Sequence, residues 1–203
     1  MASVSIQKLI RKKFKIIPIT GDFKELIGLP ECSGSIIIYG DSGNGKTTFA
    51  LKLVKHLCQF KKVGYNSIEE KAKFSFQQAV KNANLMSVNS KFKIWVSLTV
   101  EELKEELNRP KSPDVVFIDS VQYLRMKQSS TNELTKFEYK DLVNSFPQKL
   151  FVFISHAKNG EPRGALAESI YYDADVCLKV SDFIVTPNKS RYGGKIPFSI
   201  TKD

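Results

Sequence analysis

Cysteine, histidine and tryptophan are scarce in this chain of 203 residues, which holds three, two and one of them. The cysteines Cys32, Cys58 and Cys177 stand alone in the sequence, and no C-x-x-C pair occurs. That spacing excludes the common zinc modules, which need paired ligands. We therefore expect three small buried side chains in a reducing cytoplasm, without a disulfide or a structural zinc ion.

Long apolar runs are also missing. No stretch approaches the roughly 20 residues that span a bilayer, and the first residues lack the apolar core of a signal peptide. We expect a cytoplasmic protein that does not enter a membrane. The ordinary hydrophobic content of 42% favours one soluble domain with a sizeable core.

Acidic residues are outnumbered, since 21 Asp and Glu stand against 31 Lys and Arg, for a formal net charge of +10. Such a balance in a soluble protein favours a polyanionic partner, most simply nucleic acid. A generic lysine-rich surface would give the same count, because much of the excess is scattered lysine. Charge alone therefore leaves both interpretations open.

What the sequence does contain is a pattern for binding phosphate. Residues 40–47 fit G-x-x-x-x-G-K-[ST], the Walker A pattern, between a β-branched run at 35–39 and an amphipathic helical pattern at 48–57. Strand, glycine-rich turn and helix is the order that a phosphate-binding loop requires. The expected nucleotide-binding residues are Gly40, Asp41, Ser42, Gly43, Asn44, Gly45, Lys46, Thr47 and Thr48.

Each part of this loop has a physical role in binding ATP. Glycines let backbone N–H groups approach phosphate oxygens closely, and the helix N-terminus adds free donors. Lys46 would supply positive charge to the terminal phosphates, and the hydroxyl of Thr47 would ligate Mg²⁺. We therefore expect ATP and Mg²⁺ as cofactors. The alternative, a glycine-rich turn that happens to precede a helix, is disfavoured by the flanking elements.

A second pattern of nucleotide sites ends at Asp119. Residues 114–119 form an apolar run that ends in this aspartate, which is typical of a buried parallel strand carrying a Walker B carboxylate. Asp119 would hold Mg²⁺ directly or through water. The alternative is an ordinary strand-ending aspartate in a turn.

Strand and helix patterns alternate along the rest of the chain. They predict an α/β fold with a mostly parallel twisted sheet, helices on both faces and an antiparallel C-terminal extension. Polar loops are expected at 123–133 and 157–164, and a basic turn at 188–194. We expect a basic N-terminal arm at 1–20 and one ATPase domain at 21–203. The arm could dock on a neighbouring subunit, contact nucleic acid or simply be solvated.

Five stretches together resemble the RecA-like ATPases, and most closely the ATPase core of the bacterial RadA repair protein and of DnaB-type helicases. Beside the phosphate loop, they are Glu69-Glu70, Ile118-Asp119-Ser120-Val121-Gln122, Ser155-His156-Ala157-Lys158 and Lys189-Ser190-Arg191-Tyr192-Gly193. The resemblance covers roughly residues 22–200, and its phosphate loop and Walker B are the specific parts. One departure is Ser190, where the family has an asparagine.

The resemblance implies roles for four further polar side chains. Glu69 would activate the attacking water, with Glu70 as the alternate, and His156 would sense the γ-phosphate. Lys189 and Arg191 would form a cationic finger that reaches a neighbour's nucleotide, in a hexameric ring or a filament. From the residues alone, the alternatives are an exposed glutamate at a helix start, a histidine satisfied by the backbone and a solvated basic turn.

The combined hypothesis is an ATPase that binds single-stranded DNA in recombination, repair or replication and is stimulated by it. Four basic residues on two expected loops would contact the DNA backbone, namely Arg125, Lys127, Lys158 and Arg163. A second hypothesis is a regulatory or assembly ATPase with a protein partner. A small-molecule kinase is disfavoured, because no lid of clustered arginines is visible in the sequence.

Overall fold

The computed structural model describes residues 3–127 and 134–201, and all elements lie within these ranges. The helices are α1 (Ile6–Ile10), α2 (Gly21–Ile27), α3 (Lys46–Leu57), α4 (Phe74–Asn82), α5 (Val100–Asn108), α6 (Lys136–Ser145) and α7 (Ala165–Asp173), with short 3-10 segments η1 (Leu85–Lys91) and η2 (Val121–Tyr123). The strands are β1 (Ser35–Gly40), β2 (Val63–Ser67), β3 (Phe92–Val96), β4 (Val115–Asp119), β5 (Leu150–Lys158), β6 (Glu161–Pro162), β7 (Val176–Ser181), β8 (Ile184–Ser190) and β9 (Phe198–Ser199).

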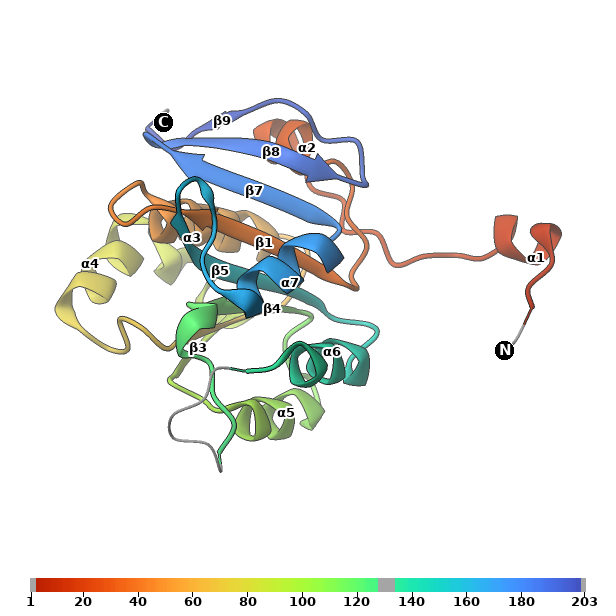
Figure 1. Ribbon diagram of the computed structural model, residues 1–203, viewed down its shortest axis with the longest axis horizontal. Coiled ribbons are helices and arrows are strands. Elements are labelled where there is room, and N and C mark those ends of the chain that lie inside the picture. The colour runs from red at the N-terminus through yellow and green to blue at the C-terminus, as the bar shows by residue number, and fades with distance from the viewer. Residues whose placement is uncertain (1–2, 128–133, 202–203) are drawn as a thin grey trace.

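One twisted sheet crosses the middle of the molecule, with the strand order β3-β2-β4-β5-β1-β7-β8-β9 (Figure 1). Strands β3 to β7 in this order run parallel to one another, whereas β8 and β9 are antiparallel. Helical crossovers between the parallel strands place helices on both faces of the sheet. The expected α/β fold with an antiparallel C-terminal extension is confirmed.

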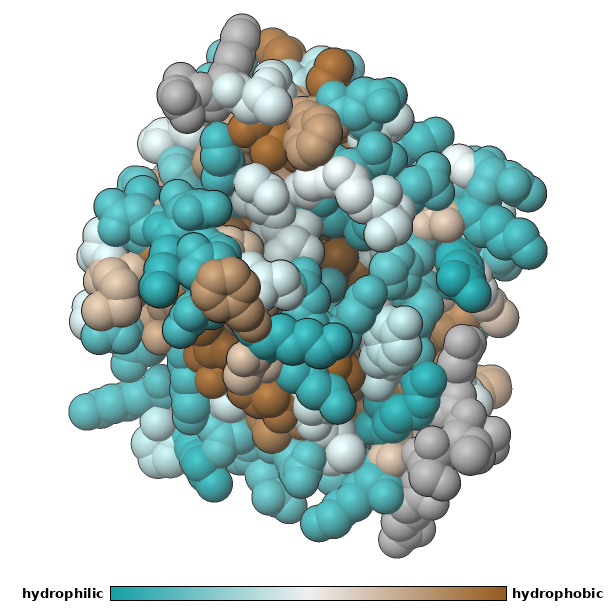
Figure 2. All heavy atoms as spheres, turned by 90° about the vertical axis from the view of Figure 1, so that its left-hand side faces the viewer, coloured by the Kyte–Doolittle hydropathy of each residue, from teal (hydrophilic) through white to brown (hydrophobic). Residues whose placement is uncertain are grey.

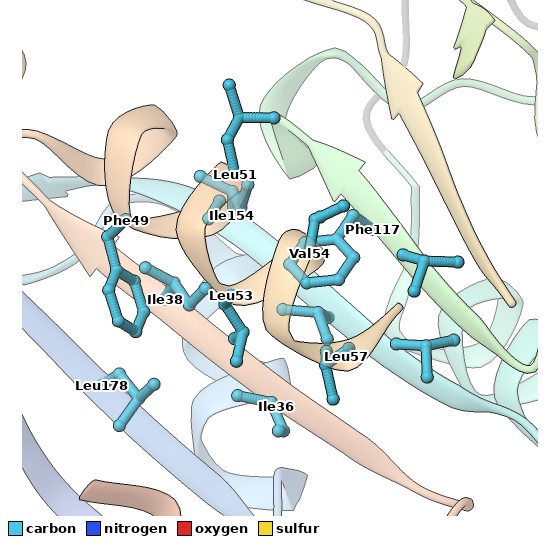
Figure 3. Close-up of a cluster of buried hydrophobic side chains, with 14 of the residues drawn as sticks. Ile36, Ile38, Phe49, Leu51, Leu53, Val54, Leu57, Phe117, Ile154 and Leu178 are labelled. Carbon is cyan, nitrogen blue, oxygen red and sulfur yellow. The ribbon is translucent and has the colours of Figure 1, made fainter. Parts of the chain in front are cut away.

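Side chains of the central strands point alternately to the two faces of the sheet, and this divides the core into two layers. In β1, Ile36 and Ile38 face the layer that holds α2, α3 and α4, while Ile37 faces the layer that holds α5, α6 and α7. Figure 3 shows Phe49 and Leu53 of α3 beside the side chains of β1. Because successive side chains of a strand point to opposite faces, a continuous apolar run is needed where both faces are covered.

Two stretches differ from the sequence expectation. The polar segment 157–164 forms a hairpin, because β5 continues to Lys158 and pairs with β6. The stretch 188–194 is a turn only in its second part, since Lys189 and Ser190 belong to β8 and pair with β7. In both places, hydrogen bonding to a neighbouring strand produces a strand although the polar composition is typical of loops. Within the expected loop 123–133, residues 128–133 lie outside the described part of the chain.

The N-terminal segment lies apart from the rest of the molecule (Figure 1). Helix α1 has no buried residues. The chain joins the body where Ile16 pairs with Glu31, and Ile17 and Ile19 are buried in the core. None of the helices in the described residues has the length and apolar character needed to cross a membrane.

Candidate functional site

A tight turn joins β1 to α3 at the carboxyl edge of the parallel strands. Two of its glycines have left-handed backbone conformations, with φ of 81° at Gly43 and 93° at Gly45, where other residues are strained. A Cβ atom on Gly43 would meet no described atom within 4 Å, so the turn is open on that side. The N–H groups of the first turn of α3 therefore border a surface that an anion can approach.

Lys46 is the first residue of α3 and is almost fully buried, with 9% of its surface exposed. Its Nζ donates a hydrogen bond to the carbonyl oxygen of Asp41, 2.8 Å away, so the side chain folds back over the loop. Burial lowers the pKa of its ammonium group, and the nearby carboxylates of Asp119 and Glu69 oppose that shift. These carboxylates thus help to retain the positive charge that phosphate binding needs.

Asp119 ends β4 at the same edge of the sheet and is 7% exposed. Burial raises the pKa of its carboxyl group to about 6; the hydrogen bond from the hydroxyl of Tyr65 opposes this shift, and Glu69 and Glu70 add to it. A buried carboxylate among other carboxylates is stabilised by nearby positive charge, which Lys46 supplies in part and a bound metal ion would add to. The hydroxyl-bearing Thr47 lines the same cavity, and this set of oxygen donors fits Mg²⁺.

Glu69 and Glu70 follow β2 but have different partners. Glu69 Oε2 lies 2.9 Å from Nε2 of His156 in β5, and the Glu69 N–H donates to the carbonyl oxygen of Asp119 at 3.1 Å. Glu70 Oε2 instead accepts a hydrogen bond of 2.7 Å from Ser75 Oγ in α4. Both carboxylates border the cavity, and Glu69 is the one that makes hydrogen bonds to the strands carrying Asp119 and His156.

These residues surround a cavity of about 280 Å³. The carboxyl edge of the sheet faces the viewer in Figure 2, where the surface is largely hydrophilic with smaller apolar patches. Phe183 belongs to the turn between β7 and β8, and no sequence signal connects it with the phosphate loop. The lining residues are Ser42, Gly43, Gly45, Lys46, Thr47, Thr48, Glu69, Glu70, Asp119, His156 and Phe183.

Three of the expected nucleotide-binding residues are not part of this lining, namely Gly40, Asp41 and Asn44. Gly40 ends β1, and a Cβ atom there would lie 2.1 Å from the carbonyl oxygen of Val180 in β7. The missing side chain at Gly40 therefore permits the close approach of two strands. Asp41 takes part through its backbone, as the acceptor for Lys46.

Gln122 connects the cavity to the two segments expected to contact DNA. Its Nε2 donates to Ser155 Oγ at 2.8 Å and to the carbonyl oxygen of Arg163 at 2.9 Å. Its Oε1 accepts a hydrogen bond of 3.3 Å from the N–H of His156. Gln122 contributes to the family resemblance, but the sequence alone does not reveal this bridging position, because it depends on the neighbouring strand.

The four basic residues expected to contact DNA lie on the two segments that Gln122 connects. Lys127, Lys158 and Arg163 are exposed. Arg125 is half-buried, because its Nη1 donates to the carbonyl oxygens of Gln122 and Leu124 at 2.6 and 2.9 Å. Three of the four side chains are thus exposed to solvent, and the fourth is committed to its own loop.

Lys189 and Arg191 lie near the opposite edge of the sheet. Lys189 Nζ donates to the carbonyl oxygen of Tyr172 at 3.1 Å, at the end of α7, and Arg191 Nη1 lies 3.4 Å from Asp175 Oδ1. The N–H of Asp175 in turn donates to the carbonyl oxygen of Ser35, the first residue of β1. The phosphate loop follows the last residue of that strand, so Arg191 is about 16–20 Å from it along the strand, by the usual rise per residue.

Comparison with known proteins agrees with this geometry. Residues 36–155 match the family described as ATPase family associated with various cellular activities (AAA). The DNA repair protein RadA of Streptococcus pneumoniae (strain ATCC BAA-255 / R6) is 29% identical over 110 residues, which cover 54% of this chain and 25% of that protein. The chain therefore matches only about a quarter of the length of this curated relative.

A solved structure, the ATPase domain of G40P, superposes with a TM-score of 0.58 at 15% sequence identity, and the match covers 83% of this chain and 81% of that chain. At this identity the similarity shows the fold. The family match spans more than half of the 203 residues and includes both the phosphate loop and Asp119. The chain therefore belongs to the ATPase family associated with various cellular activities, and its fold is of the RecA-like type.

Proposed function

We propose that this chain binds ATP in the cavity beside the phosphate loop and hydrolyses it there. The N–H groups at the start of α3 and the ammonium of Lys46 bind the phosphates. Thr47 and Asp119 hold Mg²⁺, which supplies positive charge to the phosphate oxygens when it is bound. The observation that carries the proposal is the meeting of Lys46, Asp119 and Glu69 around one cavity.

Glu69 is the proposed carboxylate that orients the attacking water. Its Oε2 lies 2.9 Å from the imidazole of His156, so the side chain has a defined position before any substrate enters. A group that accepts a proton from water must be fixed within hydrogen-bond reach of that water. His156 thereby acts as the orienting partner of Glu69, and it is also the residue through which Gln122 connects the cavity with the basic segments.

We further propose that these basic segments bind the backbone of single-stranded DNA and that the DNA stimulates hydrolysis. Support comes from three exposed cations on two segments that share the bridging side chain of Gln122. The net charge of +10 and the similarity to a DNA repair protein point the same way. Binding should fall with salt and show little base preference, since the contacts are cationic.

The test measures ATP hydrolysis and DNA affinity over a series of salt concentrations. In the test variant, Arg125, Lys127, Lys158 and Arg163 are replaced by alanine. The matched control removes the same charge from four exposed lysines elsewhere in the chain, Lys24, Lys81, Lys111 and Lys136. We expect the test variant to lose DNA stimulation and to reduce the slope of log affinity against log salt by about one unit per lost phosphate contact.

The control variant should retain most of both properties. Equal losses in the two variants would contradict a specific DNA surface and would leave only general charge attraction. A wild-type protein that hydrolyses ATP but does not bind DNA at low salt would favour a regulatory ATPase with a protein partner.

A further inference from the structure

Tyr65, in the middle of β2, has a polar atom in an otherwise apolar layer. The side chain is fully buried, with 0% of its surface exposed. Its ring stacks on Phe117, with centroids 5.8 Å apart and an interplanar angle of 13°, and packs on Phe76 at 5.4 Å. Its hydroxyl donates a hydrogen bond to Oδ2 of Asp119. A tyrosine held by two aromatic neighbours has little freedom to move its hydroxyl elsewhere.

The register of the sheet explains this contact. Strand β2 pairs with β4 so that Tyr65 lies opposite Phe117 and Ser67 lies opposite Asp119. Positions two apart along a strand face the same side, so Tyr65 and Asp119 are diagonal neighbours on one face of the sheet. The long tyrosine side chain spans that diagonal. Phenylalanine at this position would fill the same space without donating a hydrogen bond.

The hydrogen bond leaves the two oxygens of Asp119 with different environments. Oδ2 accepts the hydrogen bond from the tyrosine hydroxyl, which lies in the core, whereas the residue as a whole borders the cavity. A carboxylate without such a donor can turn about its last side-chain bond, whose rotational preference is broad. Fixing one oxygen therefore fixes the direction of the other, and partners of metal ligands commonly act in this way.

We propose that Tyr65 is a positioning residue that holds the Asp119 carboxylate so that its second oxygen faces the metal of the nucleotide site. Tyr65 touches neither nucleotide nor metal in this role, and it acts only through Asp119. The inference rests on the proposed function, in which Asp119 binds Mg²⁺. A competing explanation is that Asp119 merely satisfies a buried hydroxyl, in which case the loss of that hydroxyl would alter stability alone.

The test compares Tyr65→Phe with Tyr139→Phe. Tyr139 is also a buried tyrosine, and its hydroxyl shares a hydrogen bond of 3.2 Å with Ser35 Oγ, in the layer of α5, α6 and α7. Each substitution removes one oxygen atom and one buried hydrogen bond. The readouts are the affinity for a fluorescent ATP analogue as a function of Mn²⁺ concentration, the same affinity in excess chelator, and Mn²⁺ binding by electron paramagnetic resonance.

Tyr65→Phe should raise the Mn²⁺ concentration that gives half of the maximal gain in nucleotide affinity. We expect a rise of about tenfold or more, as is usual when the partner of a metal ligand is lost. Its nucleotide affinity in chelator should equal that of the wild type. Tyr139→Phe should change neither quantity. A metal response of Tyr65→Phe that matches Tyr139→Phe would overturn the inference while leaving the proposed function intact.

A double substitution separates positioning from damage to the fold. In the Asp119→Asn background, Tyr65→Phe should not weaken the metal response any further, because the residue acts through Asp119. A further loss of the same size in that background would overturn the inference. A wild-type protein whose nucleotide affinity does not respond to metal would overturn the proposed role of Asp119, and the inference with it.

Discussion

Glu69 and Glu70 are adjacent in the chain, yet at the residue scale they have different surroundings. Glu69 contacts His156 directly, and Glu70 accepts a hydrogen bond from Ser75 at the start of α4. Both border the cavity, so proximity alone does not separate them. The two residues are distinguished by the partner of each carboxylate, because a group that orients water needs a fixed direction.

We expect Glu69→Gln to lower the rate of ATP hydrolysis by about 10²–10⁴-fold, the usual contribution of a positioned acid or base. Nucleotide affinity should be retained, because the glutamine keeps the size of the side chain. Glu70→Gln is the matched control and should lose much less. Steady-state phosphate release together with equilibrium nucleotide binding measures both. If Glu70→Gln were the inactive variant, the assignment of the two carboxylates would be reversed.

The site residues that the sequence predicts are those with a local signal. Lys46 is placed by its spacing from Gly40 and Gly45, and Asp119 by the apolar run before it. Tyr65 and Gln122 join the site through the pairing of β2 with β4 and the position of β5 beside β4. Such contacts depend on strand order and register, which one sequence does not specify residue by residue.

At the scale of elements, β1 and the phosphate loop show how one glycine pattern serves two purposes. Gly43 and Gly45 have backbone conformations that favour glycine, whereas Gly40 lacks a positive φ. A side chain at Gly40 would meet the carbonyl oxygen of Val180 at 2.1 Å. The first glycine of the motif therefore allows β1 and β7 to pack, while the later two shape the loop.

Gly40→Ala should destabilise the nucleotide-free protein, because its new Cβ atom overlaps backbone that cannot move without disturbing β7. We expect a loss of about 3 kcal/mol or more in the free energy of unfolding, at the upper end for overpacked cores. Gly43→Ala has open space for its Cβ and should lose about 1–2 kcal/mol, the backbone cost of a left-handed alanine. Urea unfolding without nucleotide measures both, and equal losses would contradict the packing role of Gly40.

Prediction of elements from the sequence succeeds where a local pattern and the tertiary environment agree. The run 114–119 is apolar because both faces of β4 are buried. Prediction from the sequence fails for the part of β8 that carries Lys189, since lysine, asparagine and serine are typical of turns. This segment is a strand because it pairs with β7, and only the three-dimensional structure shows that pairing.

At the scale of the whole molecule, two groups of charged residues lie near opposite ends of the parallel strands. The phosphate loop follows the carboxyl end of β1, whereas Arg191 contacts Asp175 beside the amino end of the same strand. Arg191 therefore cannot serve the nucleotide of its own chain. We propose that Lys189 and Arg191 act on the nucleotide of a neighbouring copy, which requires head-to-tail contacts in a ring or a filament.

In this proposal, ATP is hydrolysed at the phosphate loop of one copy with help from the cations of the next. The test measures phosphate release by the Lys46→Ala protein, by the Arg191→Ala protein and by their equimolar mixture. Each variant alone should be nearly inactive, since a finger of this type contributes about 10³–10⁵-fold. In the mixture, about a quarter of the interfaces would combine an intact loop with an intact finger, and activity should partly return. A mixture as inactive as its components, with mixed assembly confirmed by sizing, would contradict a finger acting in trans, and wild-type rates from a correctly folded Lys46→Ala protein would contradict the phosphate-loop site.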